Sequence, residues 1–402
     1  MKKIIPFMMI ICLLFSSCQL ENEEKNKTPD SPKELRGVWI SCYDHISAYG
    51  KSHAEYLAET DRMFETIKNC GLNTAFVHLR AFSDAFYESD IFPYSAYIAG
   101  SQGNSLPFDP FEIMLESAEK YGISVHGWIN PFRISSKTDI SALCENNPAK
   151  KIFESGNKDG EICILDNGIY YNPTCVSNHK LILDGIKEII EKYAIDGIHI
   201  DDYFYPSTDE SIDKIQFEKH LSDGGKLSLS EWRKTNVNAF IASLYSAVKF
   251  EKEELIFSIS PSANIDTNEN KLYADCRMWL SSKGYADLII PQIYFGFNHE
   301  THPFEKALSD WSTFERNKSV NLACGIAAYK CDKNFSYMNE NEESDWQTKK
   351  NNLANQVETI RNNKNYCGFV VFSYGNLISN NCKEEISNMR NTIITEKKDE
   401  ER

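Results

Sequence analysis

Short apolar runs alternate with amphipathic stretches along the chain from Arg36 onward. Eight of these runs have the continuous apolar character of strands that are covered on both faces. They are Gly37–Ser41, Thr74–Arg80, Ser124–Asn130, Gly197–Asp202, Leu255–Ser260, Leu288–Phe295, Asn321–Tyr329 and Gly368–Ser373. Between them, stretches such as "EYLAETDRMFETIKNCG", "DPFEIMLESAEKYG" and "HKLILDGIKEIIEKYA" place apolar residues at the i, i+3, i+4 spacing of helices. The pattern therefore predicts an α/β protein in which helices connect parallel strands.

Eight strands with helices between them predict a single-domain (β/α)8 TIM barrel. A doubly wound open sheet has the same local pattern and is the alternative, although no Gly-rich phosphate loop follows the first strand. Two stretches do not fit the alternation of strands and helices in a simple barrel, namely residues 137–173 and the charged residues 207–228. In the first, turns at Asn157–Gly160 or Asp166–Gly168 predict a β-hairpin. We expect both as loop insertions, after strands three and four, on the side where barrel enzymes carry their active sites.

Polar and aromatic residues gather at the C-terminal ends of seven predicted strands. These ends read "RGVWIS", "FVHLR", "HGWINPFR", "HIDDYFYP", "SISPSAN", "PQIYFGF" and "VFSYGN". In a barrel all of them meet at one rim. Aromatic faces beside amide, guanidinium and carboxylate groups suit a sugar ring, which has an apolar face and a hydroxyl edge. For Trp39, Trp128 and Tyr294 the alternative is that each is a core residue that caps the barrel.

One apolar strand ends on two adjacent aspartates, Asp201 and Asp202. Two carboxyl groups that are held together titrate as a pair, and the second proton is retained to a higher pH. Glycoside hydrolysis requires one ionised and one protonated carboxyl, so we predict that both residues are catalytic. Strand alternation places His199 beneath Asp201 on the same face. The alternative is structural, with one aspartate capping the next turn and the other orienting Arg80 or Arg133.

Further residues near the strand ends are predicted to bind the substrate through rings or hydrogen bonds. They are Trp39, His78, Arg80, Trp128, Asn130, Arg133, His199, Tyr203, Gln292 and Tyr294. Arg36 is a further candidate for hydrogen bonding to the substrate. It opens its strand, however, and the alternative is that it seals the bottom of the barrel. His78, His126 and Asp201 would form a metal site only if they converged, and the sequence has no ligand pair at helical or hairpin spacing. We therefore predict neither a metal nor a cofactor.

Composition narrows the class of partner. The chain has 402 residues and a net charge of −15, which argues against nucleic acid because phosphate binding needs a basic surface. Apart from Cys12 and Cys18 near the N-terminus, its cysteines are scattered without a CxxC or a Cys/His cluster. The sequence thus predicts no disulfide framework and no zinc site. Cys324 and Cys331 are near enough to pair across a strand end, which we do not predict.

The N-terminus resembles a bacterial lipoprotein signal. Lys2 and Lys3 precede an apolar run, Ile4–Phe15, that is short for a membrane span, and "FSSC" ends on Cys18. We expect Cys18 to be lipidated and the polar residues after it to form a flexible tether. An ordinary secretory peptide is the alternative. The predicted parts are a signal peptide at 1–17, the lipidated cysteine and tether at 18–33, the barrel at 34–396 and a charged tail at 397–402.

Several separated motifs occur together in one order. They are "RGVWIS", "HGWINPFR", "YYNPTCVSNHKLILDGIKEIIEKYAIDGIHIDDYFYP", "EWRKTNVNAFI", "SISPSAN", "YADCRMWL" and "ADLIIPQIYF". Over nearly all of the chain from Glu34 to about Asn376, they resemble the glycosyl-hydrolase-like family 10, a (β/α)8-barrel group of bacterial exported proteins. The resemblance implies a glycoside hydrolase similar to enzymes that cleave peptide-free glycan strands of peptidoglycan. The chain departs from the family after strand five, where residues 262–264 replace an aromatic residue and Gly, and this leaves the substrate subsites open.

The predicted strand five is not followed by the acid/base glutamate of many barrel glycosidases, and only Asp266 lies further on. A substrate-assisted route therefore fits better. In it, the 2-acetamido oxygen of an N-acetyl sugar attacks its own anomeric carbon, Asp201 orients that group, and Asp202 protonates the leaving oxygen. Direct nucleophilic attack by one aspartate is the alternative.

These observations predict a lipid-anchored glycoside hydrolase of the bacterial cell envelope that faces the periplasm or the cell exterior. Its expected substrate is an N-acetylated glycan, with peptide-free peptidoglycan strands favoured. Its expected partners are this glycan and, through the lipid on Cys18, the membrane. The alternatives are a glycan-binding lipoprotein without turnover and a hydrolase of another polysaccharide.

Overall fold

The computed structural model describes residues 34–332, 335 and 338–400. The predicted signal peptide, Cys18 and the tether lie outside the described residues. Among the helices of the described part, none combines the length and the apolar character needed to cross a membrane. The lipid anchor therefore remains a prediction.

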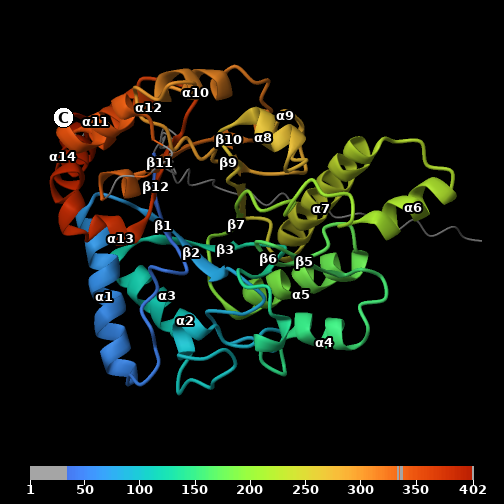
Figure 1. The fold of residues 1–402 in the computed structure, drawn as a ribbon. Helices are drawn as coiled ribbons and strands as arrows, with labels where there is room; N and C mark the ends of the chain where they lie inside the picture. Colours follow the sequence, from blue (N-terminus) through green and yellow to red (C-terminus); the bar gives the residue numbers. More distant parts are fainter. Residues whose placement is uncertain (1–33, 333–334, 336–337, 401–402) are drawn as a thin grey trace, which may run out of the picture. The chain divides into compact units, whose positions relative to one another are not determined.

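Parallel strands occupy the centre of the described part, and helices surround them (Figure 1). They form one nine-stranded sheet in the order β10-β9-β8-β7-β3-β2-β1-β12-β11. The strands are β1 (Leu35–Ile40), β2 (Thr74–Arg80), β3 (Ser124–Ile129), β7 (Gly197–Ile200), β8 (Ile256–Ile259), β9 (Leu288–Ile289), β10 (Asn321–Leu322), β11 (Cys324–Ala327) and β12 (Gly368–Phe372). Only Ala323 separates β10 from β11, so together they form the seventh barrel position, and a bridge from Gln292 to Gly325 joins this position to its neighbour. The predicted (β/α)8 barrel is confirmed.

Side-chain alternation divides the core into two layers. Residues of the inner face fill the barrel, and they are Trp39, Phe76, Trp128, Leu288, Ile290, Ala323 and Val370. Outward-facing residues such as Val77 and Ile198 pack between the strands and the helices. A methyl group on Gly37 would lie 2.9 Å from the side chains of both Phe76 and Val370. The interior is therefore filled, and a substrate has room only at the mouth of the barrel.

One group of helices follows the barrel strands and packs outside them. They are α1 (His53–Asn69), α3 (Pro110–Tyr121), α5 (Val176–Lys192), α7 (Leu229–Glu251), α10 (Phe304–Ser312), α12 (Asn352–Arg361) and α14 (Lys383–Glu400). The sequence sets their ends. Ser52 and Glu55 form a reciprocal capping box at the start of α1, and Gly122 ends α3 with a positive φ of 63°.

The other helices of the described part lie in the connections. They are α2 (Ala96–Ala99), η1 (Ile140–Ala142), α4 (Pro148–Glu154), α6 (Lys214–Ser222), α8 (Ile265–Asn270), α9 (Cys276–Ser281), η2 (Ala328–Cys331), α11 (Glu340–Thr348), α13 (Tyr374–Leu377) and η3 (Asn380–Cys382).

The first insertion, after β3, forms a small antiparallel sheet of its own. Its strands are β4 (Arg133–Ser135), β5 (Ile162–Leu165) and β6 (Gly168–Tyr171), in the order β4-β6-β5. The β5–β6 hairpin turns at residues 166–167, so the second of the two predicted turns is the hairpin turn. Asn157–Gly160 forms a separate tight turn, closed by the Gly160 N–H to the Asn157 carbonyl at 3.1 Å. The sequence did not predict β4.

The second insertion, after β7, is fastened by a buried ion pair. The Arg233 guanidinium binds both carboxylate oxygens of Asp213, at 2.8 and 2.7 Å, and both side chains are fully buried. The Tyr205 hydroxyl donates to the same carboxylate at 2.7 Å. The chain that leaves the predicted catalytic aspartates is thus attached to α7.

The cysteines in the part of the chain that the structure describes are all free thiols. Cys324 and Cys331 are among them.

Candidate active site

Asp201 and Asp202 directly follow the last residue of β7, Ile200, and so lie at the rim of the barrel. His199 lies one inward position below Asp201. Its Nε2 accepts a hydrogen bond from the Trp39 indole at 3.0 Å, and its Nδ1 lies 2.8 Å from the Ser258 hydroxyl. Burial holds the pKa of His199 well below its usual value, so the ring is neutral. His199 does not line the cavity described next, and its hydrogen bond positions Trp39. Its contact with substrate stays a prediction.

A cavity of about 150 Å³ opens at this rim. Its lining comes from the ends of β1, β2, β3, β7, β8, β9 and β12 and from β4. The predicted site residues in this lining are Trp39, His78, Trp128, Asn130, Arg133, Asp201, Asp202, Tyr203, Gln292 and Tyr294. The remaining lining residues are Ser41, Cys42, Tyr43, Ser260 and Phe372. The structure thus brings together residues that lie up to about 330 positions apart in the chain.

Arg80 is the other predicted residue that does not reach the cavity. Regular alternation gives Arg80 the same face as His78, but the pairing of β2 with β3 shifts between these two residues. The irregularity turns Arg80 away from the barrel interior, and its guanidinium packs 4.8 Å from the ring centroid of Phe92. In this structure Arg80 is outside the cavity lining, and its contact with the substrate stays a prediction.

Some of the missed lining residues carried a signal in the sequence. Ser41, Ser260 and Phe372 belong to the strand-end motifs "RGVWIS", "SISPSAN" and "VFSYGN". The pattern that selected their neighbours was sufficient to select them as well. Cys42 and Tyr43 lie in the loop after β1 and have no comparable signal.

Rings that line the cavity also belong to the barrel core. Trp39 and Trp128 are 2% and 5% exposed and are part of the inner cluster. Tyr294 packs edge-on against Trp39 at 6.4 Å and lies 5.7 Å from Phe372. These rings therefore both cap the core and line the cavity, and their contact with a sugar stays a prediction.

The two aspartates favour a shared proton. Burial, followed by repulsion from Asp202, raises the pKa of Asp201 well above its usual value. Burial also raises the pKa of Asp202, to about 6, although Gln292 and Arg133 oppose the shift. Trp128 Nε1 faces Asp201 and lowers its pKa without reaching hydrogen-bond geometry. Asp201 is the more deeply buried of the two, and both its burial and the neighbouring carboxyl favour its protonated form.

Buried polar atoms in the cavity wall lack partners within the described residues. They are both ring nitrogens of His78, Nε1 of Trp128 and Oδ1 of Asn130. The rings of His78 and Trp128 stack at 3.6 Å, and burial keeps the pKa of His78 well below its usual value. Buried polar groups in proteins are normally hydrogen-bonded. Unpaired donors and acceptors beside the two aspartates therefore mark a place for a polar ligand.

The histidines do not converge on Asp201 as a metal site. His126 packs against Phe76 at 4.8 Å inside the barrel and does not line the cavity. Among the described residues, no group of three or more His, Cys, Asp or Glu side chains is arranged to hold a metal ion.

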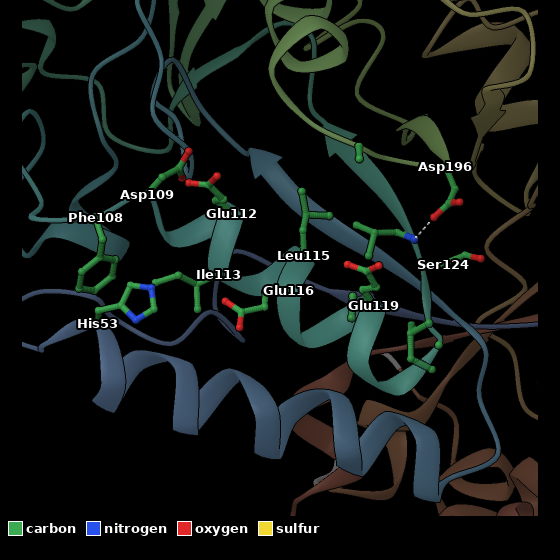
Figure 2. Close-up of a pocket in the computed structure, with 15 residues that line it drawn as sticks. His53, Phe108, Asp109, Glu112, Ile113, Leu115, Glu116, Glu119, Ser124 and Asp196 are labelled. Atoms are coloured by element: carbon green, nitrogen blue, oxygen red, sulfur yellow. Dashed lines mark hydrogen bonds between the residues drawn. The ribbon is translucent and has the colours of Figure 1, made fainter.

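A larger hollow of about 960 Å³ lies beside the N-terminal ends of β3 and β7, away from the rim. Figure 2 shows His53 next to Phe108, and the carboxylates of Glu112, Glu116 and Glu119 along α3. None of its side chains is among the buried polar groups that lack partners. The smaller cavity, with its paired acids and unpaired polar atoms, is therefore the candidate active site.

Two known proteins are similar to the chain over most of its length. Glycosyl hydrolase YngK of Bacillus subtilis (strain 168) is 33% identical over 327 residues, which cover 76% of this chain and 62% of that protein. Glycosyl hydrolase DigH of Escherichia coli O6:H1 (strain CFT073) is 26% identical over 367 residues, with 80% of this chain and 81% of that protein covered. The chain thus spans a little under two thirds of the Bacillus relative.

A solved structure shows the same fold. The PgaB (BpsB) glycoside hydrolase domain from Bordetella bronchiseptica superposes with a TM-score of 0.61 at 12% identity, covering 90% of this chain and 99% of that chain. At this identity the likeness concerns the fold alone. Residues 34–347 match the family described as Glycosyl hydrolase-like 10. Glycoside hydrolase, the enzyme class predicted from the sequence, is that of the family and of both named relatives. The chain belongs to the glycosyl hydrolase-like 10 family, as its motifs indicate.

Proposed function

We propose that this protein hydrolyses glycosidic bonds in an N-acetylated bacterial glycan, and that peptide-free peptidoglycan strands are its substrate. The observation that carries the proposal is the buried pair Asp201–Asp202 at the barrel rim, with raised pKa values and unpaired polar atoms around it. A purely structural pair of aspartates needs no such cavity. The names of the two relatives, both glycosyl hydrolases, support the same reaction.

The pair is suited to a step that needs one acid and one carboxylate. Because Asp201 is buried and Asp202 is partly exposed, and burial favours the neutral form of a carboxyl, we propose that Asp201 protonates the leaving oxygen. Asp202, ionised at neutral pH, then orients the substrate's 2-acetamido group for attack on the anomeric carbon. This reverses the division of roles expected from the sequence.

A substrate with a good leaving group tests this division. An aryl glycoside whose phenol is strongly acidic needs no protonation, so it should restore turnover to Asp201→Asn and leave Asp202→Asn inactive. Restoration in Asp202→Asn instead would return the roles to the original order. Inhibition by a sugar thiazoline is expected for the substrate-assisted route, whereas a covalent intermediate trapped with a fluorinated sugar would establish direct attack.

Digestion of peptide-stripped peptidoglycan, followed by mass analysis of the fragments, tests the proposed reaction itself. New reducing ends and disaccharide-based fragments are expected. Co-sedimentation with the strands without new reducing ends would instead identify a glycan-binding protein. Cleavage of starch or plant glycans in preference to cell-wall strands would identify a hydrolase of another polysaccharide.

We further propose that the protein acts in the bacterial cell envelope, attached through a lipid on Cys18. Support comes from the N-terminal sequence, in which a short apolar run ends in "FSSC". Attachment to the envelope would keep the enzyme next to a substrate found in the same compartment.

A further inference from the structure

The guanidinium of Arg133 is held in the cavity wall between two aromatic rings. Its Cζ lies 4.8 Å from the ring centroid of Phe82 and 4.4 Å from that of Tyr203. The backbone of Arg133 is fixed by pairing with Tyr170 in the inserted sheet. Stacking uses the faces of the guanidinium, so its N–H edges stay available to a ligand in the cavity.

This guanidinium has no anionic partner. Within the described residues, no carboxylate oxygen lies within 4.0 Å of it, and its side chain forms no hydrogen bond that meets normal geometry. A second arginine in the same molecule shows the usual arrangement. Arg233 packs against the rings of Tyr205 and Tyr273, at 5.1 and 5.2 Å from their centroids, and its N–H groups bind Asp213 at 2.7 Å. Arg133 has aromatic neighbours as Arg233 does, but no carboxylate binds its N–H groups.

The missing carboxylate is not supplied by the catalytic pair. Arg133 lowers the pKa of both Asp201 and Asp202 from a distance. It forms no ion pair with either of them. Its edge is thus free to bind an anion. The chain has a net charge of −15, and Arg133 is the only Lys or Arg side chain in the described lining of the cavity.

We infer that Arg133 binds a carboxylate of the substrate, the lactyl carboxylate that a muramic acid residue exposes once its peptide has been removed. The inference rests on the proposed function and adds its specificity-determining contact. A planar guanidinium binds a carboxylate through two parallel hydrogen bonds. When the peptide is present, the same carbon carries a neutral amide and a bulky chain. Arg133 therefore distinguishes peptide-free strands from peptide-bearing ones.

The test compares two forms of one glycan. Peptide-free strands are used as they are, or after carbodiimide coupling of methylamine converts each lactyl carboxylate into a neutral methylamide of nearly the same size. For the wild-type protein, kcat/KM should be about ten- to a hundredfold higher on the carboxylate strands. In Arg133→Gln the ratio should fall to about one, and Arg133→Lys should keep an intermediate ratio because it retains the charge without the fork.

A matched control is Arg277→Gln. Arg277 also packs on a ring, 4.0 Å from the centroid of Phe314, but it is outside the cavity lining. This variant should keep the wild-type ratio. Because each ratio compares two substrates on one protein, a general loss of stability cancels. A wild-type ratio in Arg133→Gln, or no discrimination by the wild-type protein, would overturn the inference.

Two further experiments distinguish this inference from recognition of another carboxylate and from binding without hydrolysis. A polymer of alternating N-acetylglucosamine and glucuronate carries its carboxylate on the sugar ring, and Arg133-dependent cleavage of it in preference to the strands would reject the lactyl assignment. Calorimetry with N-acetylmuramic acid and its methylamide measures the contact without turnover. If nothing is cleaved but the acid binds more tightly in an Arg133-dependent way, the proposed hydrolysis fails and the contact stands. Cleavage that does not depend on the carboxylate would support the proposed hydrolysis and reject the Arg133 contact.

Discussion

Asp201 and Asp202 lie where an ionised carboxylate is unfavourable, because water is displaced and a like charge is adjacent. The folded state therefore binds protons more tightly than the unfolded chain, whose aspartates have ordinary pKa values. Between the ordinary and the raised pKa, stability falls as the pH rises. This cost is consistent with a pair that is retained for chemistry.

Replacing Asp201 by Asn removes the cost, so we expect Asp201→Asn to be more stable than the wild-type protein at pH 7.5. The melting temperature should rise by roughly 2 to 4 °C, and the difference should vanish towards pH 4, where the wild-type carboxyl is protonated. Thermal scans across this pH range provide the measurement. Asp209→Asn is the control, because hydrogen bonds from Ser211 lower the pKa of this exposed aspartate. A stabilisation that is equal at both pH values would contradict the account.

The activity should depend on the ionisation of Asp202. With a pKa of about 6 for this group, kcat/KM should increase as the pH rises through about 6. Arg133→Gln removes a charge that lowers the pKa of both acids, so its acid limb should move to higher pH. Rate profiles at constant ionic strength measure this shift. An unchanged limb would show that Arg133 does not act on the pair.

At the scale of elements, alternation predicted the barrel strands well but failed where pairing is irregular. His199 and Trp39 lie on the inner face as a period of two requires, whereas the shift after His78 turns Arg80 outward. Irregularities of this kind depend on the neighbouring strand, which a single stretch of sequence does not show. The same holds for β4, because "RIS" is too short to carry a pattern and pairs with β6 only after the hairpin forms.

The buried pair of Asp213 and Arg233 should control the stability of the segment that follows β7. Arg233→Met leaves a fully buried carboxylate without its partner, so we expect a loss of about 3–5 kcal/mol in the free energy of unfolding. Denaturant titration measures the loss. Lys219→Met breaks an exposed pair with Asp223 and should change stability by less than about 0.5 kcal/mol. Similar losses in both variants would refute the anchoring role.

At the scale of the whole molecule, we propose that the N-terminal residues determine where the enzyme works. We expect Cys18→Ser to abolish incorporation of labelled palmitate and to move the protein from the membrane fraction to the soluble fraction. Catalysis by the purified protein should be unchanged, because the described lining of the cavity comes from the barrel. Retention of label in the variant would show that Cys18 is not the lipidated residue.

Kinetics of the two aspartate variants on peptide-free peptidoglycan strands test the central claim most directly. Asp201→Asn and Asp202→Asn should each lower kcat on unactivated strands by at least about a thousandfold, while co-sedimentation shows that both still bind the glycan. Wild-type turnover in either variant would mean that the neighbouring acids at the barrel rim do not carry out the reaction.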